Sequence, residues 1–212
     1  MELALVAAGS YLIGGINPAY FITRCKKGVD IRDCGTGNAG ATNAMFAIGL
    51  QLALVVMLLD VLKTVVCVTA ARLWLRGDLY AGPIAGLSCM YGHIFPVWLR
   101  FRGGKGVMAA LGLALVLDWK VALICLAVFI AVVALTRIVS LGSCLASVTF
   151  VVLTAVFRTY VYRQEPAEVA FCTLAAAAVV CLLIIKHIPN IRRILKGTEN
   201  RFGSRPSAQK KE

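Results

Sequence analysis

The stretch VMAALGLALVLDWKVALICLAVFIAVVAL, residues 107–135, decides the fold class of this 212-residue chain. It is too long for one membrane-spanning helix, which needs about 20 mostly apolar residues. Asp118, Trp119 and Lys120 interrupt it with polar and interfacial side chains. We therefore interpret it as two passes, a short one at 104–117 and a normal one at 121–136.

Further apolar stretches lie on both sides of this segment, at roughly 3–23, 48–75, 80–99, 138–157 and 166–185. Hydrophobic residues make up 60% of the chain and the mean hydropathy is +0.84, whereas ordinary globular domains are about 45–50% apolar. The sequence thus predicts an all-α integral membrane protein with seven transmembrane helices. Because the first stretch carries Glu2 in place of a basic leader, we do not expect a cleaved signal peptide.

The distribution of Lys and Arg predicts the orientation of these helices. Seven passes put the termini on opposite sides, and cytoplasmic loops are rich in Lys and Arg. With the N-terminus outside, the inner loops hold sixteen of the 22 cations and the outer loops five, with Lys63 inside a span. We therefore expect a cytoplasmic C-terminus. Anionic lipid headgroups account for most of the net charge of +12, so no nucleic-acid partner is expected.

The organisation expected from these patterns is a single polytopic membrane domain at 1–202, followed by a disordered cytoplasmic tail at 203–212. Its cytoplasmic loops, at about 24–44, 92–106 and 186–202, hold the polar sequence that exceeds what connections need. The eight cysteines form no CxxC pair and no Cys/His cluster. We expect no metal and no cofactor.

The first of these loops contains VDIRDCGTGNAGATN, residues 29–43. Gly35, Gly37 and Gly40 match GxGxxG, but a dinucleotide site needs a preceding strand in a βαβ unit. Glycines still let a backbone approach an anion, and N–H groups at a helix start bind phosphate oxygens. One interpretation is a flexible connection with helix caps. A phosphate-binding loop is favoured because the polar side chains outnumber those of one cap: Thr36, Asn38, Thr42 and Asn43.

The second loop contains GHIFPVWLRFRGGKG, residues 92–106. It predicts two glycines and Lys105 at a helix N-terminus, where an anion meets both the positive end of the helix dipole and a point charge. The loop lacks the GxxxxGK[ST] pattern of a nucleotide-binding P-loop. His93 lies near the membrane surface, where it is either a ligand of the substrate or a packing residue.

The third loop contains KHIPNIRRILKGTENRF, residues 186–202, directly after the last apolar stretch. A positively charged stop after a membrane helix accounts for its cations. It does not account for His187, Asn190 or Glu199. Both histidines of the chain thus lie in the predicted cytoplasmic loops.

Asp60 and Lys63 are three residues apart inside the second apolar stretch, so they share a face of a helix. Each would cost about 2.5–3.5 kcal/mol at the bilayer centre if it had no partner. The sequence predicts that they pair with each other or face a polar cavity.

Together, DCGTGNAGATN, GHIFPVWLRFRGGKGV and HIPNIRRILKGTE resemble, in order, the motifs of the bacterial PlsY family of acyl-phosphate:glycerol-3-phosphate acyltransferases. The resemblance covers nearly the whole chain. It implies transfer of a fatty acyl group from acyl phosphate to the 1-hydroxyl of glycerol 3-phosphate, giving lysophosphatidic acid and phosphate, the first step of phospholipid synthesis. It also implies a multi-pass protein of the bacterial inner membrane with its active site in the cytoplasm. We expect a monomer in the lipid bilayer.

The resemblance implies catalytic roles by position for Thr36, where the family usually has serine, and for Lys105, His187 and Asn190. It implies that eleven further residues bind substrate: Gly35, Gly37, Asn38, Gly40, Thr42, Asn43, His93, Gly103, Gly104, Arg193 and Glu199. Phosphate is a good leaving group, so positioning and charge stabilisation suffice without a protein nucleophile.

The chain departs from the family pattern at Phe46, where an arginine is usual, and less markedly at 108–110. Losing a guanidinium removes a bidentate phosphate ligand. Either a neighbouring cation replaces it or the chain is a divergent paralogue with altered activity. The alternative from another class is a membrane carrier of an anionic phosphate-bearing metabolite, but the related halves typical of transporters are not found.

Overall fold

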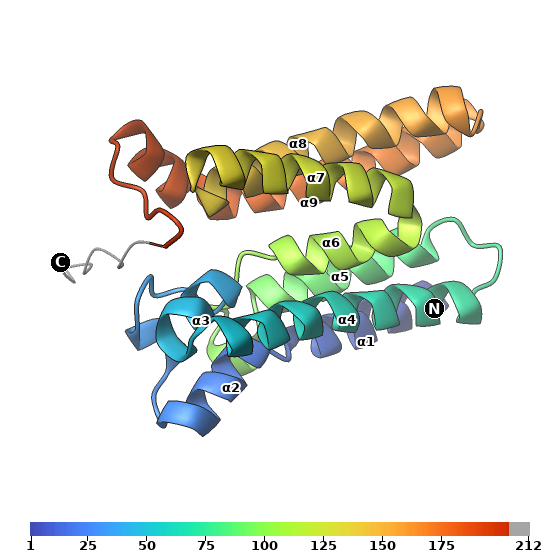
Figure 1. Ribbon diagram of the computed structural model, residues 1–212. Helices are drawn as coiled ribbons and strands as arrows, with labels where there is room; N and C mark the ends of the chain where they lie inside the picture. Colours follow the sequence, from blue (N-terminus) through green and yellow to red (C-terminus); the bar gives the residue numbers. More distant parts are fainter. Residues whose placement is uncertain (204–212) are drawn as a thin grey trace. The chain divides into compact units, whose positions relative to one another are not determined.

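The structure, a computed structural model, describes residues 1–203. The tail expected at 203–212 therefore lies, apart from Gly203, outside the described residues. All regular structure in the described part is helical. The described residues form two compact units, one over Met1–Leu113 and the other over 114–203. The α-helices, drawn in Figure 1, are α1 Glu2–Gly15, α2 Pro18–Lys27, α3 Ala41–Ile48, α4 Leu50–Trp74, α5 Ala81–Ile94, α6 Val107–Leu117, α7 Trp119–Thr136, α8 Val139–Val156 and α9 Pro166–Leu195.

Helix α4 has an apolar face that points outward and a polar face that points inward. Its exposed side chains are spaced four residues apart, and their exposed fractions run from 44% to 57%: Leu54, Leu58, Leu62 and Val66. Asp60 and Thr64, on another face of the same helix, are at most 2% exposed. Burying polar side chains while exposing leucines suits a surrounding of lipid.

Five helical stretches of residues 1–203 are long and apolar enough to cross a membrane: Glu2–Lys27, Leu50–Trp74, Trp119–Thr136, Val139–Val161 and Pro166–Leu195. The predicted all-α class is thereby confirmed for the described residues, and these helices have the length and apolarity that a membrane protein requires. The expected passes at 80–99 and 104–117 correspond to the shorter helices α5 and α6, and the count of seven stays a prediction.

The first apolar stretch is not the single helix expected at 3–23. Helix α1 ends at Gly15 and α2 begins at Pro18. Pro18 lacks a backbone N–H and disfavours helical geometry at the residue before it. Asn17 takes an extended conformation there, and its Oδ1 accepts a hydrogen bond of 2.8 Å from the N–H of Tyr20, which caps α2.

The helix boundaries differ from the apolar and loop segments of the sequence at three other places. Helix α5 ends at Ile94 rather than near 99, because Pro96 disfavours helix at the residue before it. Much of the loop expected at 24–44 is helical: α2 runs to Lys27, a 3-10 turn covers 31–33, and α3 begins at Ala41. Gly49, with φ of 87°, separates α3 from α4.

Helix α9 continues ten residues beyond the apolar stretch that predicted it, from 166–185 to Leu195. Hydropathy marks where lipid contact ends, whereas a helix persists for as long as its backbone bonds do. Pro189 lies inside it and withdraws one N–H without ending it. The expected loop at 186–202 is therefore helical over its first ten residues, which include His187 and Asn190.

Helices α1 and α5 pack with their backbones almost in contact, and glycines make this possible. A Cβ on Gly14 would lie 2.0 Å from the carbonyl oxygen of Cys89, and one on Gly92 would lie 2.0 Å from that of Tyr11. Small residues at such crossings are typical of membrane helices. In Figure 1, helices α1, α4 and α5 of the first unit pack against one another. In the second unit, α8 packs against both α7 and α9.

We expect Gly14→Ala to destabilise the protein by about 1–3 kcal/mol, because the added methyl group meets backbone atoms that have no room to move. Gly9→Ala is the matched control on the same helix, since nothing lies within 4 Å of a Cβ there. It should leave the stability unchanged or raise it slightly. Thermal unfolding in detergent measures both, and equal melting temperatures for the two variants would contradict the packing assigned to Gly14.

Candidate active site

The loop of residues 28–40, here the glycine loop, is built around the amide of Asn43. Its Oδ1 accepts a 2.7 Å hydrogen bond from the N–H of Thr36, and its Nδ2 donates to the carbonyls of Ile31 and Cys34 at 2.8 and 3.0 Å. Asn43 is fully buried. The amide of Asn43, which the resemblance assigns to substrate binding, therefore lies beneath the loop and fixes the loop's shape.

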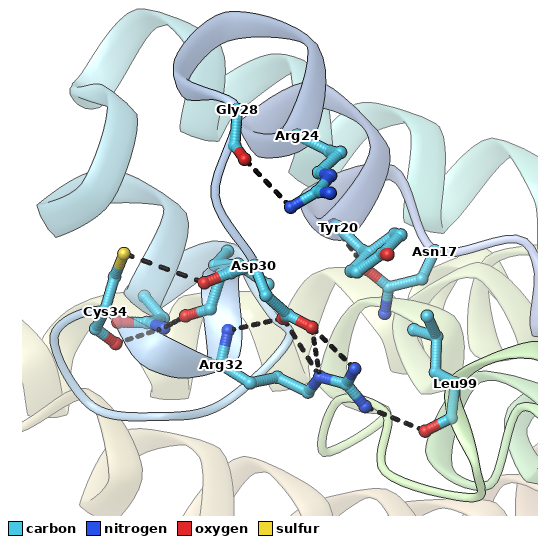
Figure 2. Close-up of polar contacts among 10 residues, drawn as sticks. Asn17, Tyr20, Arg24, Gly28, Asp30, Arg32, Cys34 and Leu99 are labelled. Carbon is cyan, nitrogen blue, oxygen red and sulfur yellow. Dashed lines mark hydrogen bonds and ion pairs between the residues drawn. The ribbon is translucent and has the colours of Figure 1, made fainter.

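An ion pair inside the glycine loop joins it to the segment after α5. The guanidinium of Arg32 donates to both carboxylate oxygens of Asp30 at 2.6–3.1 Å, and its Nη1 donates to the carbonyl of Leu99 at 2.8 Å (Figure 2). The hydrogen bond from Arg32 holds the pKa of the Asp30 carboxyl below its usual value. Arg32, counted above only as a cytoplasmic cation, therefore serves as a tether between two loops.

The remaining polar side chains of this region are turned toward solvent or partly so. Gly35 and Gly37 have φ of 52° and 72°, a backbone region that favours glycine. Thr36 and Asn38 are half-buried and Thr42 is exposed. Within residues 1–203 these three side chains form no hydrogen bond. The loop is held by other residues, so their hydroxyl and amide groups are available to a ligand.

Residues 102–106, here the lysine segment, lie against the end of α5 through two backbone hydrogen bonds. The N–H of Gly103 donates to the carbonyl of Ile94, and the N–H of Gly104 donates to that of His93, both at 3.1 Å. A Cβ on Gly103 would lie 2.0 Å from the His93 oxygen. Both glycines are thus required by close approach. As predicted, Lys105 comes just before a helix, α6.

The predicted pairing of Asp60 with Lys63 is confirmed, and His93 joins it. The Oδ1 of Asp60 lies 2.8 Å from Lys63 Nζ and 3.2 Å from His93 Nδ1, and all three side chains are at most 8% exposed. Of the two interpretations left open for His93, this burial favours contact with protein groups over contact with substrate.

The glycine loop and the lysine segment, about 60 residues apart in sequence, meet at Ala39. The Nδ2 of Asn17 donates to the Ala39 carbonyl at 2.9 Å, and a Cβ on Gly104 would lie 2.9 Å from that same oxygen. The break between α1 and α2 therefore supports both loops. Asn17 was not singled out from the sequence, although an Asn-Pro pair inside an apolar stretch is the signal that reveals it.

In the second unit, Glu199 fastens the turn after α9. Its Oε1 accepts from Asn190 Nδ2 at 2.5 Å and from the Ser140 hydroxyl at 2.7 Å, while Oε2 accepts from Arg193 Nε at 2.7 Å. Burial alone would raise the pKa of Glu199, but these three hydrogen bonds outweigh it and the pKa lies below its usual value. Glu199 therefore orders Asn190 and Arg193. No sequence pattern pointed to Ser140.

His187 is 2% exposed and lies one turn before Asn190 on α9. Its Nδ1 lies 2.8 Å from the carbonyl oxygen of Leu183. A carbonyl only accepts, so Nδ1 carries the proton and Nε2 is the acceptor of the neutral ring. This tautomer is the one suited to receiving a proton at Nε2.

The predicted site residues thus fall into two groups, each ordered by its own contacts. The first unit holds those of the glycine loop, α3 and the lysine segment together with His93. The second holds the four on or after α9: His187, Asn190, Arg193 and Glu199.

Because its pKa is lowered in the folded protein, Glu199 contributes stability that is fully present above the unfolded pKa of about 4.3 and is lost as the pH falls through the folded value. We expect Glu199→Gln to lower the melting temperature at pH 7, and this difference from the wild type to shrink as the pH falls below about 4. Thermal unfolding across this range measures it. Glu165→Gln, at an exposed position, is the control and should show no such trend. If the effect of Glu199→Gln did not change with pH, the stabilising role assigned to the hydrogen bonds of Glu199 would be wrong.

A family model described as glycerol-3-phosphate acyltransferase matches residues 4–197. A relative of that name from Thermoanaerobacter sp. (strain X514) is 41% identical over 205 residues, covering 97% of this chain and 98% of the relative. Another from Clostridioides difficile (strain 630) is 40% identical over 205 residues, covering 95% and 96%.

Two crystal structures of PlsY, described as an integral membrane glycerol 3-phosphate acyltransferase, are similar to this chain. The glycerol 3-phosphate form has a TM-score of 0.85 at 33% identity, and the lysophosphatidic acid form a TM-score of 0.82 at 31% identity. Each comparison covers 96% of both chains.

Proposed function

The chain belongs to the glycerol-3-phosphate acyltransferase family, and on this basis we propose that it transfers a fatty acyl group from acyl phosphate to the 1-hydroxyl of glycerol 3-phosphate. The products are lysophosphatidic acid and inorganic phosphate. The observation that carries the proposal is the joining of two glycine-containing loops at Ala39, which sets Lys105 and a helix start beside the glycine loop. Both substrates are phosphate anions suited to such a surface.

Phosphate binding is assigned to Lys105 and to the loops at 35–43 and 103–106, with Thr36, Asn38 and Thr42 as polar ligands. Phe46 lies close to Gly35, about 3.5 Å from where a Cβ on that glycine would be. The family's usual arginine is therefore replaced beside the glycine loop itself. Lys105 is the neighbouring cation that we assign to the charge of the phosphate.

In the reaction, the 1-hydroxyl oxygen attacks the acyl carbon and the bond from that carbon to the phosphate oxygen breaks. The phosphate leaves with the bonding electron pair. The hydroxyl proton passes either to Nε2 of His187 or to the departing phosphate. Asn190 and His187 orient the acceptor or the carbonyl, and Arg193 binds a phosphate oxygen while Glu199 fixes both Arg193 and Asn190.

The topology proposed is seven passes in one polytopic domain of a monomer, with the N-terminus outside and the active site at the cytoplasmic face of the bacterial inner membrane. The excess of Lys and Arg in the corresponding loops supports this orientation. Helices α5 and α6 are short, so part of the non-helical backbone between them lies at membrane depth. The N–H and C=O groups of that backbone need hydrogen-bond partners within the protein. The bonds from Gly103 and Gly104 to Ile94 and His93 meet that requirement.

The test is an assay of the purified protein in lipid, offering acyl phosphate and glycerol 3-phosphate. We expect equal amounts of lysophosphatidic acid and inorganic phosphate. A folded preparation that forms neither product would refute the function, and product formed only with a different acyl donor would refute acyl phosphate as the substrate.

Lys105→Ala is expected to abolish turnover without unfolding the protein, because it removes a point charge at the phosphate. The loss should be at least about 100-fold in kcat, on the scale of removing one stabilising group from a transition state. Arg102→Ala is the matched control, an exposed cation in the same segment, and should keep most of the activity. If Lys105→Ala had near-normal activity, the assignment of phosphate to this segment would be wrong.

A further inference from the structure

Lys63 is a buried cation whose three ammonium protons all have acceptors. Its Nζ lies 3.0 Å from the carbonyl oxygen of Gly14, 2.9 Å from that of Ile16 and 2.9 Å from Nδ1 of His93. Asp60 Oδ1 is 2.8 Å away and balances the charge. An ammonium donates at most three hydrogen bonds, so these contacts fix its position. The mechanism above uses none of them.

The carbonyls of Gly14 and Ile16 belong to the point where α1 ends. Residues at a helix C-terminus present carbonyls without intrahelical partners, and in a membrane segment no water satisfies them. Lys63 supplies both bonds from α4. The cation thereby stabilises the break that lets Asn17 reach the glycine loop at Ala39.

His93 connects the same cation to the lysine segment. Its Nδ1 lies 2.9 Å from Lys63 Nζ and 3.2 Å from Asp60 Oδ1, and its Nε2 lies against Gly104, only 2.1 Å from where a Cβ on that residue would be. Its backbone carbonyl accepts the N–H of Gly104. A ring 3% exposed and enclosed in this way is held between α4 and the backbone next to Lys105.

We propose that Asp60, Lys63 and His93 form a positioning cluster that sets the place of Lys105 in the phosphate site, without touching substrate themselves. The inference rests on the proposed function and extends it to two charged residues inside a membrane helix. Two charged residues in lipid cost free energy. We attribute their presence in this helix, despite that cost, to the fixed position that they give the two loops. The cluster thus acts through Lys105, so its contribution to activity should disappear when Lys105 is replaced.

The experiment is a double-mutant cycle on the purified protein in lipid. Asp60→Asn combined with Lys63→Met removes both charges together, since removing one alone leaves an uncompensated buried charge. In the wild-type background, we expect the pair to lower kcat/KM by about 100-fold, the loss typical of a catalytic group displaced by about 1 Å. In a Lys105→Arg background, where the lysine geometry is already lost, the same pair should lower it by less than about 5-fold.

Thr64→Val is the matched control, a buried change on α4 next to the cluster. Its effect, whatever its size, should be the same in both backgrounds. An equal loss from the charge pair in both backgrounds, or no loss in the wild type, would overturn the positioning cluster. An inactive wild type would instead overturn the proposed function, so the two failures are distinguishable.

A second pair of variants covers the case in which the double substitution does not fold. His93→Asn keeps a polar atom near the position of Nδ1, whereas His93→Leu keeps bulk without an acceptor. We expect His93→Asn to retain at least about 10-fold more activity than His93→Leu, because the asparagine amide can still accept from Lys63 or donate to Asp60. Equal activities would overturn the contact from Lys63 to His93 as the basis of positioning.

Discussion

The backbone carbonyls left at the end of α1 impose the constraint on which the rest of the first unit depends. They lie inside a segment apolar enough to cross a membrane, where an unsatisfied carbonyl costs several kcal/mol. Lys63 satisfies those of Gly14 and Ile16 from the neighbouring helix. Once the break is stable, Asn17 is free of helical geometry and reaches the glycine loop. The interrupted helix is therefore a structural support for the loops above it.

Close backbone approach is the second feature that organises the site. Gly103 and Gly104 lie so near the end of α5 that a methyl group on either would overlap with His93. The same device brings α1 and α5 together at Gly14 and Gly92. Ordering loops through backbone contacts leaves side chains such as Thr36 to face a ligand. Gly14, Gly92, Gly103 and Gly104 therefore serve as packing residues, because none of them has room for a side chain.

Several cations of this protein are paired with carboxylates, so the number of Lys and Arg residues overstates the positive charge that can meet a phosphate. Arg32 is neutralised by Asp30, Arg193 by Glu199 and Lys63 by Asp60. Each pair neutralises a cation locally, although the net charge of +12 already counts both partners. Counting cations predicts which side of the membrane a loop faces, but the number that meets a phosphate is decided by their partners.

The sequence by itself determined the helical membrane class, the order of the three motifs and the pairing of Asp60 with Lys63, because hydropathy, glycine content and spacing of three residues are local properties. It did not determine that Asn17 supports the glycine loop, that Ser140 contacts Glu199, or that Asn43 lies beneath its loop. Those outcomes depend on hydrogen bonds between residues far apart in the chain, such as Asn17 with Ala39, Ser140 with Glu199 and Asn43 with Ile31. Tertiary structure alone decides which polar groups satisfy the protein's own backbone and which remain to meet a substrate.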